Sequence, residues 1–431
     1  MPDARRTAFV LLEDGTRFDG EACGALDADG DSPAATGEVV FTTGMAGYQE
    51  SVTDPSFAGQ LIVFTYPHIG NYGVRTEAME SDRIHARAVI MREAVDHEDA
   101  PSSEQGWLSW LRDAGIPAIT GLDTRALVRH IRDKGAMRGG VFAGDVPEAD
   151  AAARIAAEPS MVGQDLASTV TPERVEIVGA ERNADGPLIA AIDTGIKRSI
   201  VTELVARGAR VRLHPLSDGP DVLLGDEPGG APDAIFLANG PGDPGAVEHV
   251  VDTLRAVLGR KPVFGICMGH QLLCRAVGLQ TFKLPFGHRG GNHPVKDLTT
   301  GRVEITSQNH GFAVQTPDGT GRIEGDEPVR WKTDFGPAEL SHLNLYDRTV
   351  EGLVLPEANA ATVQYHPEAA PGPNDAGYLF DRFLDRIRTH SSIADVGRQT
   401  GDHAARQAGI APGRDDPPDA SGPSTTTDTS A

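Results

Sequence analysis

The amino-acid sequence predicts an α/β fold in two parts, a C-terminal doubly wound parallel sheet preceded by a smaller mixed β/α domain. From Leu188 onward, short apolar segments of strand length alternate with segments of helix length. This alternation is typical of parallel sheets covered by helices on both faces. The first 145 residues instead carry strand-like segments between turns rich in Gly and Asp. A length of 431 residues also exceeds one ordinary core, so we expect two or three domains.

The N-terminal domain is predicted over residues 1–145. Strands are expected at 7–12, 39–42 and 60–66. The intervening segment 41–60 has no clear periodicity and is interpreted as a loop followed by a brief helix. A further helix is expected to begin after Asp123, which can cap it, and to stop at Gly135. Its apolar residues share one face: Leu127, Val128 and Ile131.

Residues 146–187 are rich in Ala, Glu, Pro and Asp and are interpreted as a connector with one helical segment around 151–157. The C-terminal domain is predicted over residues 188–392. Its strands are expected at 188–193, 210–213, 234–238, 263–266 and 361–364, and its helices at 196–208 and 246–258. Residues 393–431 have almost no apolar content, which predicts a disordered acidic and polar tail.

Composition excludes several classes of partner. The formal net charge is −23, whereas nucleic acids and anionic membranes are bound by basic surfaces, so neither is expected. Only six of the 39 basic residues are lysine. An acidic surface is best tolerated where salt screens the repulsion between carboxylates, which indicates a halophilic source.

Apolar patterning and cysteine usage both predict an intracellular protein. No apolar run reaches 18 residues and the amino terminus lacks a signal-peptide core, so we expect a cytoplasmic protein. The three cysteines, Cys23, Cys267 and Cys274, are too few for a disulfide framework and form no metal-type pair. No metal site is expected.

The segment VFGICMGHQLL (263–273) is the strongest chemical signal. Val263 to Ile266 form a β-prone apolar run, and the glycines at 265 and 269 allow a sharp turn into a helix beginning near His270. Cys267 would then lie in strained backbone at a helix amino terminus, where partial positive charge and free N–H groups favour a thiolate. The alternative is a buried core cysteine that follows a strand.

Two further motifs follow predicted strands. NGPGDP (239–244) carries glycines that can bring backbone N–H groups close to a ligand, although a plain β-turn has the same composition. QYHPE (364–368) places His366 two residues before Glu368. A cysteine nucleophile needs a base, and the base needs a partner that orients it. A metal or surface role for this pair is the alternative, but no third ligand has suitable spacing.

These motifs together resemble a known family. FGICMGHQLL (264–273), NGPGDP and QYHPEA look like a class I glutamine amidotransferase domain, which has a flavodoxin-like sheet. Further segments resemble the small-subunit family of carbamoyl phosphate synthetase, and the resemblance covers roughly residues 7–388. They are GEVVFTTGMAGYQESVTDP (37–55), TYPHIGNYG (65–73), DTRALVRHIRDKGAMRGG (123–140), FGHRGGNHPVKD (286–297), SQNHGFAV (307–314) and HPEAAPGPNDAGYLFDRF (366–383).

The resemblance implies hydrolysis of L-glutamine and transfer of ammonia to a large synthetase subunit, which makes carbamoyl phosphate for arginine and pyrimidine synthesis. Cys267 would be the nucleophile, His366 the base and acid, and Glu368 its orienting partner. Backbone N–H groups of Met268 and Gly240 would form the oxyanion hole. Other positions would hold glutamine: Gly44, Gly242, Gln271, Asn309, Gly311 and Phe312. No cofactor is expected on this chain, because ATP and Mg would be used by the large subunit.

One position departs from the family pattern. Gly44 stands where some relatives have a serine that touches glutamine, so only backbone contact is possible there. His270 and His310 lie beside the motifs without an assigned role. An amidotransferase serving GMP, anthranilate or CTP synthesis would not explain residues 37–140. A cysteine hydrolase would not need Gln271, Asn309 and Gly311. A non-catalytic regulatory subunit would be marked by loss of the nucleophile, which is present.

Overall fold

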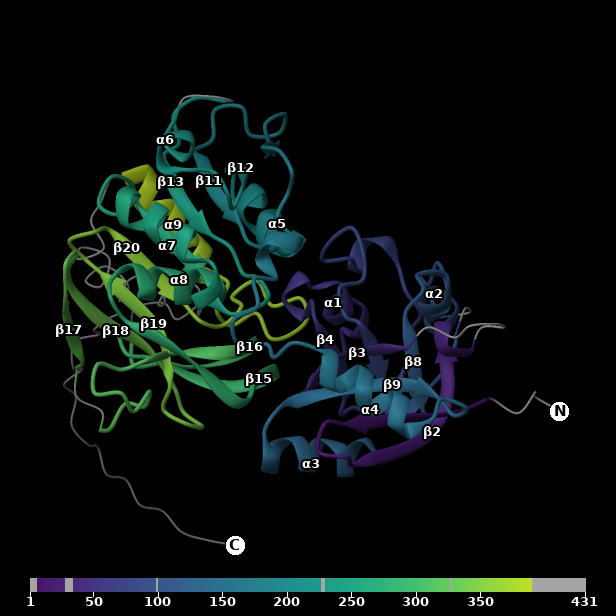
Figure 1. Cartoon of the computed structure of the whole chain (residues 1–431). Helices are drawn as coiled ribbons and strands as arrows, with labels where there is room; N and C mark the ends of the chain where they lie inside the picture. The colour runs from purple at the N-terminus through teal and green to yellow at the C-terminus, as the bar shows by residue number, and fades with distance from the viewer. Residues whose placement is uncertain (1–5, 28–33, 98–99, 226–228, 326–327, 390–431) are drawn as a thin grey trace, which may run out of the picture.

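The structure is a computed structural model that describes residues 6–27, 34–97, 100–225, 229–325 and 328–389. A barrel formed by the first part of the chain lies beside a large sheet formed by the second part (Figure 1). The expected tail, 393–431, lies outside the described residues. Among the residues that are described, no helix is both long and apolar enough to cross a membrane.

Seven strands close the N-terminal barrel in the order β1-β2-β8-β6-β4-β3-β9. They are β1 (Thr7–Leu12), β2 (Arg17–Gly24), β3 (Ala35–Thr42), β4 (Gln60–Phe64), β6 (Ala88–Ile90), β8 (Pro117–Thr120) and β9 (Met137–Ala143). Pairing is parallel from β3 through β4 and β6 to β8 and antiparallel elsewhere. The three predicted strands are present as β1, β3 and β4. The others were not predicted, because β2 and β9 contain glycines and polar residues and β6 and β8 are very short.

Helices pack around the barrel: α1 (Tyr48–Thr53), α2 (Trp107–Asp113), α3 (Thr124–Lys134) and α4 (Glu148–Ala157). The short strands β5 (His68–Ile69) and β7 (Glu93–Ala94) form a separate pair. The predicted helix boundaries at α3 are confirmed. The Asp123 carboxylate accepts the Ala126 N–H at 3.0 Å, and Gly135 ends the helix with φ of 101°.

The segment interpreted as a connector contributes to both parts of the molecule. In α4, Ala151 and Ile155 pack against Phe9 and Phe142 of the barrel. Farther along, β10 (Glu176–Val178) pairs antiparallel with a strand of the second sheet. Composition alone did not reveal this, because alanine is both a common linker residue and a small core residue.

The second sheet begins with the predicted doubly wound arrangement. Its first strands run in the order β10-β12-β11-β13-β14-β20. Apart from β10, these strands pair in parallel with one another. The strands are β11 (Leu188–Asp193), β12 (Arg210–Pro215), β13 (Ala234–Leu237), β14 (Val263–Ile266) and β20 (Ala360–Val363). The helices are α5 (Arg198–Ala206), α6 (Pro220–Leu223), α7 (Glu248–Val257), α8 (Met268–Ala276) and α9 (Tyr378–Thr389). Helices α7 and α8 pack on one face of the sheet, while α5 and α9 pack on the other.

An antiparallel extension of this sheet was not predicted. It continues from β20 through β19 (Val350–Leu355), β18 (Gly336–Asn344), β15 (Gln280–Asp297) and β16 (Val303–Gln315), with β17 (Arg330–Thr333) beside β18. The sequences of β15 and β16 are rich in Gly, His and Asn, and their pairing contains two register shifts, so simple alternation is lost. Strand β15 contacts β3 and α3 of the barrel, which connects the two parts.

Candidate active site

Cys267 occupies the sharp turn between β14 and α8. Its backbone has φ 54° and ψ −105°, a left-handed conformation that is strained for any residue except glycine. The turn is possible because its neighbours have no side chain. A Cβ on Gly269 would lie 2.3 Å from the Leu237 carbonyl oxygen, and one on Gly265 would lie 2.9 Å from the Gly269 carbonyl oxygen. The predicted strand–turn–helix at the cysteine is therefore present.

The adjacent strand β20 brings His366 to the same edge of the sheet. The Cys267 N–H donates to the Val363 carbonyl oxygen at 2.9 Å, so the chain beyond β20 emerges beside the thiol. His366 Nδ1 and Glu368 Oε1 are 2.6 Å apart, and both side chains are buried. A short hydrogen bond at Nδ1 fixes the ring and directs Nε2 away from the carboxylate. Nε2 has no hydrogen-bond partner among the described residues.

Charges around this pair favour a protonatable histidine. Burial alone would lower the pKa of His366, but the Glu368 carboxylate and the neighbouring Cys267 raise it above its ordinary value. Burial would raise the pKa of Glu368, yet the charges of Lys197 and His366 lower it. Glu368 is therefore ionised at neutral pH, and it stabilises the imidazolium that forms when His366 accepts a proton.

Lys197 is a site residue that the sequence reasoning missed. Its ammonium lies 2.9 Å from Glu368 Oε1 and donates to the Ala369 carbonyl oxygen at 2.7 Å, with the side chain only 3% exposed. The residue follows β11, and this position at the carboxyl end of a parallel strand was a signal that could have found it. Lys197 neutralises a carboxylate that would otherwise be costly to bury.

The thiol faces a small cavity of about 20 Å³. Most of the predicted glutamine-holding residues line it together with Cys267: Gly240, Gly242, Gln271, Asn309, Gly311 and Phe312. A Cβ on Gly240 would lie 2.2 Å from the Thr194 carbonyl oxygen, which explains why this loop contains glycine. The cavity holds about one water molecule, so it is too small for a glutamine side chain.

A larger cavity of about 410 Å³ lies next to it, and Asn309 lines both. This second cavity is lined by His366, Lys197 and Gly44, among others. The structure thus places Gly44 with the base rather than with the thiol. The Met268 side chain is buried in the hydrophobic core, and only its backbone at the start of α8 is near the turn.

Hydrogen bonds from both parts of the chain hold the predicted glutamine-binding residues in place. Asp54, which follows α1, accepts from the Asn309 amide at 2.8 Å. Asn309 is in the middle of β16, and its carbonyl oxygen lies 3.6 Å from Cys267 Sγ. Gln271 donates to the Phe312 carbonyl oxygen at 2.8 Å and to Gln364 at 3.0 Å. Asp54 and Gln364 lie inside the motifs quoted above, 37–55 and 364–368, but neither was given a role, because their partners lie far away in the sequence.

Histidines beside the site have structural partners. His270 Nδ1 lies 2.8 Å from the Thr362 hydroxyl, and burial lowers the pKa of His270 to about 3. His310 contacts the Phe312 carbonyl oxygen and Gln308 at 2.7 and 2.9 Å. His288, His310 and Glu351 bring metal-type atoms within 4.8 Å of one another, but both nitrogens of His310 already have partners in the chain. The expectation of no metal site remains a prediction.

Comparison with known proteins covers both parts of the chain. The family model for the carbamoyl-phosphate synthase small chain, CPSase domain, matches residues 10–141, and the model for glutamine amidotransferase class-I matches residues 190–386. A carbamoyl phosphate synthase small chain from Streptomyces coelicolor is 43% identical over 384 residues, which are 88% of this chain and 96% of that one. One from Chlorobaculum tepidum is 44% identical over 385 residues, 88% and 97% of the two chains.

The similarity therefore extends over nearly the whole length of the relatives and through both the barrel and the sheet. An amidotransferase for another pathway would match only the second part. The chain belongs to the family of carbamoyl phosphate synthase small chains, and its second part is a class I glutamine amidotransferase domain.

Proposed function

We propose that Cys267, His366 and Glu368 form the catalytic unit that releases ammonia from L-glutamine for a carbamoyl phosphate synthase. The observation that carries the proposal is the buried His366–Glu368 pair at the end of β20, next to the strained cysteine at the end of β14. A thiol, a base and an orienting carboxylate in this arrangement are the parts that acyl transfer requires.

His366 takes the proton of the Cys267 thiol, and the thiolate sulfur attacks the side-chain amide carbon of glutamine. The carbonyl oxygen becomes an oxyanion. When the tetrahedral intermediate collapses, the C–N bond breaks, His366 returns the proton to the departing nitrogen, and ammonia leaves with a glutamyl thioester behind. Water activated by His366 then hydrolyses the thioester to glutamate and regenerates the thiol. Glu368 keeps Nδ1 protonated through both half-reactions.

The oxyanion needs donors at the turn. Backbone N–H groups of Met268, the first residue of α8, and Gly240, which lines the thiol cavity, are the proposed donors. One such donor typically contributes about 3–4 kcal/mol to transition-state stabilisation. Glutamine binding must enlarge the thiol cavity, because about 20 Å³ does not accommodate the substrate. Joining it to the neighbouring cavity across Asn309 would supply the space.

We further propose that the ammonia passes to a large synthetase subunit, which uses bicarbonate, ATP and Mg to make carbamoyl phosphate for arginine and pyrimidine synthesis. The small-chain family membership supports a large-subunit partner. The chemistry proposed for this chain itself uses a thiol, an imidazole and a carboxylate and requires no bound cofactor. We also propose a cytoplasmic location, on the basis of membership in the small-chain family.

Covalent labelling tests the nucleophile. A diazo ketone analogue of glutamine should alkylate Cys267, and mass spectrometry of peptides should locate the adduct. Excess L-glutamine should protect against labelling, and His366→Asn should slow it, because the thiol then lacks its base. Cys274 is an internal control, since it is buried in the core on the same helix. Loss of glutaminase activity accompanied by labelling at Cys274 or Cys23 would contradict the assignment.

A further inference from the structure

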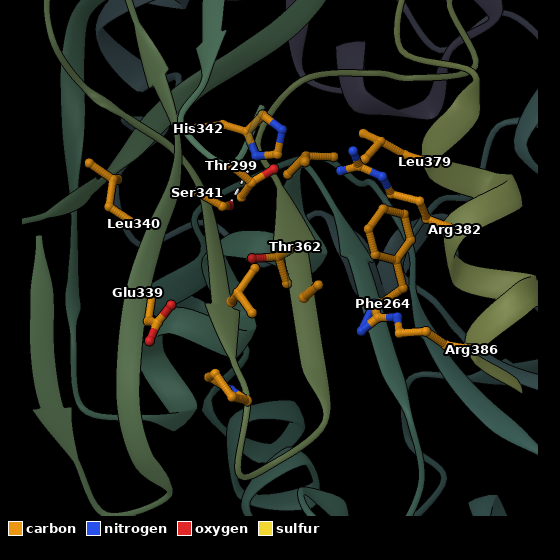
Figure 2. Close-up of a pocket in the computed structure, with 14 residues that line it drawn as sticks. Phe264, Thr299, Glu339, Leu340, Ser341, His342, Thr362, Leu379, Arg382 and Arg386 are labelled. Carbon is orange, nitrogen blue, oxygen red and sulfur yellow. Dashed lines mark hydrogen bonds between the residues drawn. The ribbon is translucent and has the colours of Figure 1, made fainter. Parts of the chain in front are cut away.

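A cavity of about 230 Å³ lies between helix α9 and the sheet (Figure 2). Strands β14, β18, β19 and β20 form one side of it and α9 forms the other. None of its lining residues lines the two cavities beside Cys267 and His366. The proposed glutaminase reaction therefore leaves this cavity without a role.

The cavity is lined by a buried cation that has no counter-charge among the residues described by the structure. Figure 2 shows Arg382 and Arg386 extending from α9 toward the strands. Arg386 is only 5% exposed, and its Nη1 atom has no hydrogen-bond partner among the described residues. Burial and the neighbouring charge of Arg382 lower the pKa of Arg386 to about 10. A guanidinium in this position remains charged at neutral pH, and a buried charge without a partner is strongly destabilising.

The other charged groups at the cavity are already paired. Arg382 lies 3.7 Å from Asp297, whose carboxylate also accepts from Thr299. Glu339 lines the cavity, but its carboxylate pairs with Arg330 at 2.9 Å. Among the described residues, no carboxylate forms an ion pair with Arg386. The chain as a whole carries a net charge of −23, so its surface does not attract anions in general. Any binding of an anion here would depend on the local positive charge of this cavity.

A second unpartnered polar atom belongs to a residue that lines the cavity. His342 lines the cavity and is fully enclosed, and its Nε2 atom has no hydrogen-bond partner in the described part of the chain. The opposite nitrogen, Nδ1, lies 2.9 Å from the Ser341 hydroxyl. Burial lowers the pKa of His342 to about 4, so the ring is neutral. If Ser341 donates to Nδ1, Nε2 carries the hydrogen and is a donor.

The remaining walls are mostly apolar. They are formed by Phe264, Leu340, Val354, Pro356, Val363 and Leu379. An inorganic ion would leave this surface uncovered, whereas an apolar body would fill it. Guanidinium groups bind carboxylates and phosphates through paired N–H donors. The lining thus matches a ligand with one anionic head and a small apolar body.

We propose that this cavity is a binding site for a small organic anion, a carboxylate or phosphate monoester on an apolar body, with Arg386 as the main contact of the anionic head. His342 Nε2 is the one further donor proposed for the ligand, because the Thr299 and Ser341 hydroxyls already bond to Asp297 and to His342 Nδ1. The ligand would contact Phe264 and Val363 on the two strands that lead to Cys267 and His366.

Thermal melts and calorimetric titration of the full-length chain, at constant ionic strength in KCl, test the proposal. Benzoate and phenyl phosphate are the probes. Benzamide is the uncharged control for benzoate, and inorganic phosphate is the control that has the anionic group without an apolar ring. We expect saturable binding of benzoate or phenyl phosphate and a rise in Tm of about 2 °C or more. The probe that binds more tightly shows whether the site prefers a carboxylate or a phosphate group. Benzamide and inorganic phosphate should have little effect.

Substitutions on α9 locate the site. Arg386→Met should abolish the Tm shift and lower the measured affinity at least about tenfold, while the ligand-free protein keeps or gains stability because an unpaired charge is removed. Arg388→Met is the matched control, since Arg388 lies on the same helix, is 48% exposed and pairs with Asp385. Its ligand-induced shift should equal that of the wild type.

Three results would overturn the anionic part of the proposal. They are the absence of saturable binding by both anionic probes, equal binding of benzamide and benzoate, or an undiminished shift in Arg386→Met. Inorganic phosphate binding as tightly as phenyl phosphate would also contradict the apolar part of the site. If Arg386→Met does not fold, the comparison of benzoate with benzamide on the wild-type chain still decides the outcome.

Discussion

Lys197 connects stability to catalysis at the scale of single residues. Its ammonium is the largest charge that lowers the pKa of Glu368, and Glu368 in turn orients His366. A carboxylate with a lowered pKa contributes stability above its unfolded pKa of about 4.3, and this contribution is lost as the pH falls through the folded value. Removing Lys197 should therefore weaken both the fold and the base.

We predict that Lys197→Met lowers the free energy of unfolding at pH 7 by about 3–5 kcal/mol, the usual cost of breaking a buried ion pair. The acid-side loss of glutaminase activity should also move to higher pH, because the pKa of Glu368 rises. Urea denaturation and a pH profile of ammonia release measure the two effects. Lys332→Met, at an exposed position, is the control. An unchanged acid limb would contradict the assigned role of Lys197.

His366 has the opposite sign of pH dependence. Its pKa is raised in the folded protein, so the stability it contributes is complete below its unfolded pKa of about 6.5 and is lost as the pH rises through the folded pKa. We predict that wild-type stability declines over this alkaline range more than that of His366→Asn. Denaturation measured at several pH values above 6.5 tests this. Parallel curves for the two proteins would show that His366 is not coupled to Glu368 as described.

The turn between β14 and α8 sets the geometry at the scale of elements. Gly269 lets α8 approach β13 so closely that a methyl group would lie 2.3 Å from the Leu237 carbonyl oxygen. We predict that Gly269→Ala destabilises the protein by about 1–3 kcal/mol, the usual cost of overpacking, and reduces glutamine hydrolysis by displacing Cys267. Gly219→Ala is the matched control, with φ of −81° and no atom within 4 Å of the added Cβ. Equal effects of the two substitutions would contradict the close-approach argument.

The parallel half of the sheet and its turns could be predicted because each signal is local. β11, β13 and β14 are short, fully buried apolar runs, and Asp123 and Gly135 mark the ends of α3. The antiparallel extension could not be predicted in the same way. Strand β15 alternates buried and exposed residues irregularly and carries two register shifts against β16. Its conformation depends on long-range pairing rather than on local pattern.

The same contrast holds for the site. Cys267, His366 and Glu368 were predicted from short motifs that follow strands, and the structure brings them to one sheet edge. Lys197 and Asp54 were missed because they reach the site from other elements through tertiary contacts of 2.9 and 2.8 Å. The position of Lys197 after a parallel strand was the one local signal, and it did not identify the partner Glu368.

Net charge governs behaviour at the scale of the whole molecule. With −23 formal charges and few lysines, repulsion between carboxylates is screened only when ionic strength is high. We predict that Tm falls as KCl is lowered from molar concentration to dilute buffer, measured by calorimetry or fluorescence at fixed pH. Replacing KCl by an uncharged osmolyte should not restore it. A Tm that stays constant in dilute buffer would exclude the proposed adaptation to salt.

The most direct test of the central claim compares nitrogen donors in the complex reconstituted with the large subunit. We predict that Cys267→Ser reduces glutamine-dependent carbamoyl phosphate formation by at least about 10³-fold, because a hydroxyl hardly ionises beside a base suited to a thiol. Formation from ammonium chloride should remain at the wild-type rate, and Cys274→Ala should retain both activities. Undiminished glutamine-dependent synthesis by Cys267→Ser would contradict the nucleophile assignment, and loss of both activities would show that Cys267 is structural.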